Sequence, residues 1–343
     1  LRHLELIKLV LESYGGQATV ALIQETLVPD VIEEDWKKWW ADAKKEMKGD
    51  GHYQLPVKKT EPIVYHAEEL SPADKLMSNI RDAKGLKAQL AAATELCKSI
   101  DGVENKEAVL DEVVSILNEA IKNHLTLKPS LALEAILLRD AIRTQSGIQP
   151  QEGELTANDI YEKADDLAGL IEGLSAAKQK LALEAFRQAH PDTWVDTYLK
   201  LINETGLRLV GELIQILIDT GHFEKFKAGL AKLISKREAS TDLMLWMGKN
   251  RSDSFADILG PEVFRAMMAA IENDRFEDRK TSKLGDLILS DQELITDLIG
   301  SADIELVEDL VRALQATNSF DDMDKRSLLG RIVKEFPSIQ SLI

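Results

Sequence analysis

Three of the five tryptophans of this chain lie within five residues, and lysines surround them. The tryptophans are Trp36, Trp39 and Trp40, and the lysines are Lys37, Lys38, Lys44, Lys45 and Lys48. A lysine ammonium binds phosphate or carboxylate, whereas a tryptophan ring fills a core or anchors a protein interface. This segment is therefore the strongest candidate for a contact with nucleic acid or with a protein partner.

A helix is the element that would sort these side chains. At about 100° per residue, the apolar side chains share one face, which comprises Trp36, Trp39, Trp40, Ala43 and Met47. Lys37, Lys44 and Lys48 fall on one flank, with Lys38 and Lys45 further round. The acidic residues Asp35, Asp42 and Glu46 fall on the other flank. We expect this helix over residues 33–48, with three acidic residues in its first turn, where they complement the helix dipole.

The neighbouring segments predict a winged-helix domain over residues 1–66. Apolar residues at helical spacing predict helices near residues 4–14 and 19–28, and Gly15 and Gly16 end the first of them. Residues 51–66 contain two β-prone stretches around a turn, which predicts a hairpin. Lys58 and Lys59 lie in that turn, the wing.

Three interpretations of the tryptophan helix remain open. The tryptophans belong to the core and the lysines are merely solvated; or the lysines and the wing, within residues 33–60, contact phosphate; or an exposed tryptophan docks a protein partner. Residues 1–66 contain nine basic and eleven acidic side chains, a net charge of −2. A typical DNA-binding domain is clearly basic, so the charge argues against the second interpretation.

The apolar spacing in the rest of the chain predicts helices and no strands. We expect a helical segment over residues 67–147 and a helical array over residues 155–343. The polar stretch 145–154 between them predicts a loop or linker. The sequence Leu-Ala-Leu-Glu-Ala occurs at residues 131–135 and again at 181–185. The fold class is therefore mostly α, with a solenoid-like array that is either HEAT-like or irregular. Residues 67–343 have a net charge of −15, which favours a protein-binding scaffold over a nucleic-acid groove.

The sequence contains no pattern that predicts catalysis. Glycine-rich phosphate loops and the Gly-x-Ser-x-Gly motif are absent, and the six histidines are scattered without zinc-enzyme spacing. The acidic run at residues 321–324 is interpreted as a helix cap. We expect no catalytic residue, cofactor or metal, and hence no enzyme.

The single cysteine, Cys97, permits no internal disulfide, and no apolar run approaches the ~20 residues that span a bilayer. A cytoplasmic location without membrane contact is the expectation.

Several motifs together resemble a known family. Residues 36–45 read Trp-x-x-Trp-Trp-x-x-Ala-Lys-Lys, followed by Lys48-Gly49-Asp50; residues 243–251, 287–294 and 322–337 add further similarity. The chain resembles the long N-terminal extension of certain bacterial Gre-type transcript cleavage factors. The resemblance implies a transcription elongation factor that acts through RNA polymerase.

In that family, acidic residues at the tip of a coiled-coil hairpin assist cleavage. The hairpin motif, Gly-Asp-Leu followed closely by Glu-Asn and an aromatic residue, is absent from this sequence. We therefore expect the accessory region that precedes the Gre module, with the module itself absent and its start near Ile343. The expected function is docking to RNA polymerase or an associated protein. The alternatives are a nucleic-acid-binding winged helix on an acidic scaffold and a stand-alone helical adaptor.

Overall fold

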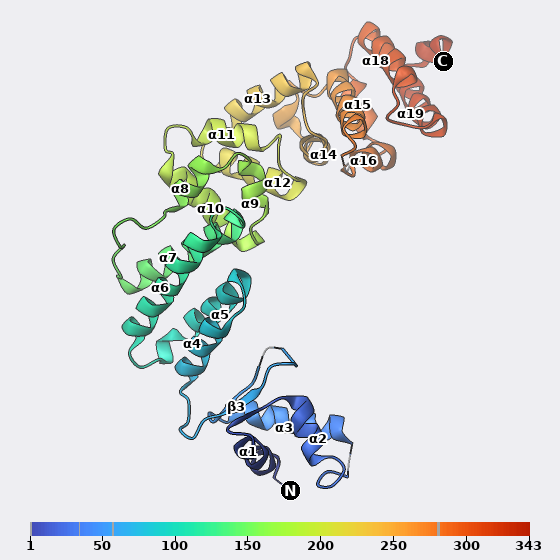
Figure 1. Cartoon of the computed structure of the whole chain (residues 1–343). Helices are drawn as coiled ribbons and strands as arrows, with labels where there is room; N and C mark the ends of the chain where they lie inside the picture. Colours follow the sequence, from blue (N-terminus) through green and yellow to red (C-terminus); the bar gives the residue numbers. More distant parts are fainter. Residues whose placement is uncertain (1, 34, 57, 280–281) are drawn as a thin grey trace. The chain divides into compact units, whose positions relative to one another are not determined.

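The computed structural model describes residues 2–33, 35–56, 58–279 and 282–343, and it is mostly helical, as predicted (Figure 1). Contacts group the chain into two units, residues 1–160 and residues 161–343, and each is described here by itself. The finer divisions expected at residue 66 and at residues 147–155 stay predictions. Among the described helices, none is both long enough and apolar enough to cross a lipid bilayer.

The first unit begins with the predicted winged-helix domain, which we call the head. Its helices are α1 (His3–Ser13), α2 (Val20–Leu27) and α3 (Trp36–Gly49), and its strands are β1 (Gln17–Ala18), β2 (Tyr53–Gln54) and β3 (Ile63–Tyr65). The antiparallel sheet has the order β1-β3-β2, so the β2–β3 connection forms the wing. The predicted hairpin is present, and β1 adds a third strand that the sequence did not predict.

Local chemistry ends and begins these helices. Gly15 and Gly16 have φ angles of +74° and +91°, which glycine adopts without strain, and they end α1 as expected. The Thr19 hydroxyl accepts a hydrogen bond from the Leu22 amide at 3.2 Å and caps α2. The Asp35 carboxylate accepts one from the Lys37 amide at 2.9 Å. The predicted start of the third helix was therefore too early: Asp35 is the cap, and the first turn contains no acidic residue.

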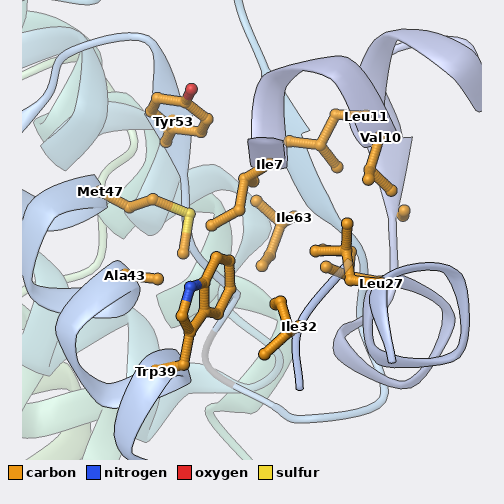
Figure 2. Close-up of a cluster of buried hydrophobic side chains, with 12 residues drawn as sticks. Ile7, Val10, Leu11, Leu27, Ile32, Trp39, Ala43, Met47, Tyr53 and Ile63 are labelled. Atoms are coloured by element: carbon orange, nitrogen blue, oxygen red, sulfur yellow. The ribbon is translucent and has the colours of Figure 1, made fainter. Parts of the chain in front are cut away.

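One apolar cluster holds the head together. Figure 2 shows Trp39, Ala43 and Met47 projecting from α3 toward Ile7 of α1 and Ile63 of β3. The remaining buried members of this cluster are Val10, Leu11, Ala18, Ile23, Leu27, Ile32 and Tyr53. The cluster draws on all three helices and all three strands, so burial of these side chains fixes the orientation of α3.

Four further helices complete most of the first unit: α4 (Pro72–Asp82), α5 (Leu86–Lys98), α6 (Lys106–His124) and α7 (Pro129–Ser146), with a 3₁₀ turn, η1 (Ile100–Gly102). Helix α5 packs on α4 and α7, and α6 packs along α7. The Gln54 amide donates a hydrogen bond to the Ser78 hydroxyl at 2.8 Å, and the Lys75 ammonium donates one to the Asp50 carbonyl at 2.9 Å. These bonds attach the sheet of the head to α4.

The second unit is all helical in its described part. Helix α8 (Ala157–Lys163) contains the boundary after Ile160. The following helices are α9 (Leu167–Glu172), α10 (Ala176–Ala189), α11 (Trp194–Leu201), α12 (Leu207–Asp219), α13 (Phe223–Lys236), α14 (Thr241–Lys249), α15 (Pro261–Phe276), α16 (Leu284–Ser290), α17 (Leu294–Ile299), α18 (Ile304–Ala316) and α19 (Asp322–Glu335). Two 3₁₀ turns accompany them, η2 (Asp253–Phe255) and η3 (Pro337–Leu342).

The helices of this unit contact the helix two places further along the chain. Helix α12 packs on α14, α13 on α15, α14 on α16 and α15 on α17. Hydrogen bonds also involve residues that lie outside the helices. The Asn203 side chain, between α11 and α12, is hydrogen-bonded to the backbone of Glu238 and Ser240, between α13 and α14. The Arg251 guanidinium, just after α14, donates hydrogen bonds to Asp291 and Asp297. The two Leu-Ala-Leu-Glu-Ala segments lie in α7 and α10, one in each unit. A helical repeat stays a prediction.

The acidic run at residues 321–324 lies where capping was expected. The Asp321 carboxylate accepts a hydrogen bond from the Asp324 amide at 2.8 Å at the start of α19. Its position at the positive end of the helix dipole supports the same structural role.

Candidate functional site

Helix α3 separates its tryptophans from its lysines, but the three tryptophans are not equivalent. Trp39 is 8% exposed and lies in the core, whereas Trp36 and Trp40 are half-buried at its margin. The Trp36 ring stacks on Trp39, with ring centroids 5.6 Å apart, and on Trp40, at 5.3 Å. The rings therefore form a stacked group that covers one side of the apolar cluster.

Five lysines occupy one side of the exposed surface of α3. Lys37, Lys38, Lys44, Lys45 and Lys48, which we call the lysine face, are all exposed. At about 100° per residue they occupy one continuous arc that only the small Ala41 interrupts. Asp42 and Glu46 lie beyond one edge of the arc. The Glu46 carboxylate is hydrogen-bonded to Nδ1 of the His3 ring at 2.8 Å, so the Glu46 side chain is directed toward α1.

The wing supplies the other two predicted lysines. Lys58 and Lys59 follow β2 in the connection to β3, and both are exposed. The base of this connection is held by an ion pair between Glu61 and Lys84, which lies between α4 and α5, with the charged atoms 3.1 Å apart. The lysine face and the wing lysines thus belong to one folded domain on a supported scaffold.

None of these seven lysines forms an ion pair with a carboxylate of the residues that the structure describes. The other two basic residues of the head do: Arg2 pairs with Glu5 at 3.4 Å and Lys8 with Glu12 at 3.8 Å. An ammonium without an internal carboxylate partner can bind an external anion without first breaking a pair. The arrangement can therefore bind phosphate or carboxylate groups.

A buried ion cluster in the loop after α7 was not predicted. The Glu154 side chain is 8% exposed and pairs with Arg143, while Arg139 lies 3.7 Å away and Asn118 donates a hydrogen bond at 2.7 Å. Burial opposes ionisation of Glu154, but the hydrogen bonds from Arg143 and Asn118 and the charge of Arg139 outweigh it. They hold the pKa of Glu154 at about 2.

The loop or linker predicted over residues 145–154 is anchored at its end to α6 and α7 through this cluster. The only trace of this cluster in the sequence is a pair of arginines one helical turn apart, Arg139 and Arg143 on α7. Folding brings Glu154 of the following loop beside them. No periodicity rule connects a loop residue to a helix in this way.

Several of the histidines have partners close by in the sequence. The His52 ring contacts the Asp50 carboxylate at 2.8 Å, and the His124 and His190 rings contact backbone carbonyls of their own helices. Over the described part of the chain, no group of three or more His, Cys, Asp or Glu side chains converges in a way that would hold a metal ion.

Comparison with known proteins gives the two parts of the chain separate matches. Residues 2–70 match the GRAD helix-turn-helix domain, which corresponds to the head and its connection to α4. Residues 72–325 match the GreA-associated C-terminal domain, which corresponds to α4 and most of the helices that follow it. The second match alone covers well over half of the chain.

The chain is also similar to a protein that is named as a GreA factor. The protein "Transcription elongation factor GreA" of Chlamydia trachomatis is 24% identical over 279 residues, which cover 77% of this chain and 37% of the relative. The chain thus spans little more than a third of the length of that protein. No solved structure matches the chain. The predicted resemblance to Gre-type factors is confirmed, and the chain belongs to the family of the GreA-associated C-terminal domain, with a GRAD helix-turn-helix domain at its front.

Proposed function

We propose that this chain is an accessory interaction region in Gre-related transcription elongation, which docks on RNA polymerase or an associated protein in the cytoplasm. The observation that carries the proposal is the similarity over 77% of the chain to a protein named for transcription elongation, together with the two Gre-associated matches. The chain would act by binding and not by catalysis, since the exposed lysines of its candidate site are suited to contacts with anionic groups.

The second unit offers side chains suited to protein docking. Phe276, at the end of α15, is 92% exposed, and Met323, at the start of α19, is 80% exposed. The Arg275 guanidinium donates a hydrogen bond to the Asn318 carbonyl, so the end of α15 lies beside the connection that leads into α19. Large apolar side chains held in water by a firm scaffold are the kind that anchor protein interfaces.

A pull-down of purified RNA polymerase with the chain tests this proposal. We expect recovery of polymerase at low salt, and a Phe276→Ala/Met323→Ala variant should lower the affinity roughly tenfold, since an anchor residue contributes more than about 1 kcal/mol. The matched control is Leu181→Ala/Leu306→Ala, at positions 48% and 46% exposed, which should bind as the parent chain does. Absence of polymerase from the recovered material at low salt would refute the proposal.

A second candidate function is contact with nucleic acid through residues 33–60, and the unpaired lysines favour it. All seven lysines are exposed and free of pairs with described carboxylates, and they lie on the third helix and the wing of a winged-helix domain. These are the elements that meet the duplex in helix-turn-helix proteins. The net charge of −2 over residues 1–66 sets the limit: the contact would be weak and confined to this side of the head.

Charge reversal tests the second function. A Lys37→Glu/Lys44→Glu/Lys58→Glu variant should lose binding of a fluorescent duplex at low salt, measured by anisotropy, because three attractive contacts become repulsive. The control Lys163→Glu/Lys180→Glu/Lys232→Glu changes the net charge equally at exposed positions of α8, α10 and α13. Equal affinity of the two variants would show that the head does not contact the nucleic acid.

A further inference from the structure

The solvent side of the head lacks asparagine and an unpaired arginine, the side chains that read adenine and guanine most selectively. Residues 1–70 contain no asparagine and a single arginine, Arg2, which is paired with Glu5 at 3.4 Å. Bidentate readout of adenine uses asparagine or glutamine, and the arginine fork is the most selective reader of guanine. The exposed positions of α3 carry lysine, alanine and two acids instead.

The glutamines of the head do not replace them. The Gln54 amide donates hydrogen bonds to Ser78 and Asp82 of α4, and its carbonyl oxygen is hydrogen-bonded to the His66 ring. Both ends of this side chain therefore already have partners within the protein. Gln17 and Gln24 lie in β1 and α2, outside the third helix. The cationic groups exposed on α3 are therefore all lysine ammonium groups, and a phosphate oxygen can bind an ammonium as well as an acceptor on a base edge can.

The tryptophans do not form an open platform for unstacked bases. Trp36 stacks on both Trp39 and Trp40, and Trp39 also meets the His3 ring edge-on, with centroids 4.9 Å apart. Binding of single strands draws on aromatic faces that are free to stack on successive bases. Because these rings stack on one another within the domain, the lysines are left as the binding groups.

The length of the lysine face suits a backbone contact. From Lys37 to Lys48 the helix rises roughly 16 Å at 1.5 Å per residue. Successive phosphates of one strand lie about 3.4 Å apart along the duplex axis but also wind around that axis, so a straight helix of this length meets only some of them.

We propose that the lysine face of α3, together with Lys58 and Lys59, holds duplex DNA by its phosphate backbone without reading its sequence. This inference rests on the second candidate function above. A factor of transcription elongation meets every sequence that is transcribed, and a contact limited to phosphate would serve at each of them. Each phosphate contact should contribute about −0.9 to the slope of log K against log salt, so seven lysine contacts would give a slope no steeper than about −6.

The test compares three labelled ligands in anisotropy titrations with the full chain over a range of salt concentrations. They are two duplexes of equal length and unrelated sequence, and one single strand from the first duplex. We expect the two duplexes to bind within about twofold of each other and the single strand more weakly. Lys44→Ala should weaken both duplexes equally and reduce the salt slope by about 1, whereas Lys232→Ala, on α13, should leave both values unchanged.

The outcomes separate this inference from the functions on which it builds. A preference of more than tenfold for one duplex would overturn the inference and leave nucleic-acid binding intact. Tighter binding of the single strand would overturn it in favour of base stacking. Absence of binding by all three ligands at low salt would overturn both the inference and the second candidate function, while polymerase docking is decided by the separate pull-down.

Discussion

Glu154→Gln should lower the free energy of unfolding of the first unit by about 3 kcal/mol, one of the two largest effects that we expect in this chain. The substitution removes the carboxylate that faces Arg139 and Arg143, whose side chains are 3% and 9% exposed, and leaves both guanidinium groups buried. Asp140 lies 2.9 Å from Arg139 and offers partial compensation, but it is 50% exposed and cannot replace a buried partner. This places the effect at the lower end of the range for broken buried pairs.

The same cluster predicts the direction of the pH dependence. The pKa of Glu154 is about 2 in the folded chain and close to 4.5 in the unfolded chain. Because the folded pKa is the lower of the two, the stabilisation is fully present above pH 4.5 and is lost as the pH falls toward 2. The difference in stability between the parent chain and Glu154→Gln should therefore shrink over that interval.

Hydrogen exchange in α6 and α7, combined with urea denaturation at neutral and acidic pH, measures both effects. The control is Glu152→Gln, an exposed residue of the same loop, which should change neither value. If the two variants are equally stable at neutral pH, the cluster does not anchor the loop.

Trp39→Ala should destabilise the head by about 3–5 kcal/mol, the range for large aromatic side chains removed from a core. Trp39 contributes to the cluster that contains Ile7, Ile32, Met47 and Ile63, and its loss opens a cavity between α3 and α1 (Figure 2). Trp40→Ala should cost less, because that ring is half-buried and its loss leaves a gap that water can enter. Exchange rates of the α1 and α3 amides in the full chain report the difference.

The same pair of variants also distinguishes core packing from partner docking. A Trp40→Ala chain that keeps the exchange protection of the head but recovers less polymerase would identify Trp40 as a partner anchor. Equal destabilisation by Trp39→Ala and Trp40→Ala would contradict the division between a core ring and a marginal ring.

Most helices of the chain could be located from sequence because their signals are local. Apolar residues at intervals of three and four predict helices over residues 176–189 and 223–236, which are the observed bounds of α10 and α13. The same spacing predicts one long helix over residues 158–174, whereas the structure has two helices there, α8 and α9. The Asp166 carboxylate accepts a hydrogen bond from the Gly169 amide at 2.9 Å and starts a second helix, a break that apolar periodicity alone does not reveal.

The sequence by itself determined that α3 is a helix with tryptophan on one side and lysine on another, because helical geometry alone sets that pattern. Only the tertiary structure decided that Trp39 is enclosed and that Trp36 and Trp40 lie at the margin, since α1 and β3 cover one ring more than the others. Strand β1 exists only through its pairing with β3, in which Ala18 faces Ile63. The burial of Glu154 and the lack of ion pairs between the lysines and the carboxylates that the structure describes likewise depend on groups far apart in the chain. Contacts between distant residues form only when the chain is folded, so no local pattern records them.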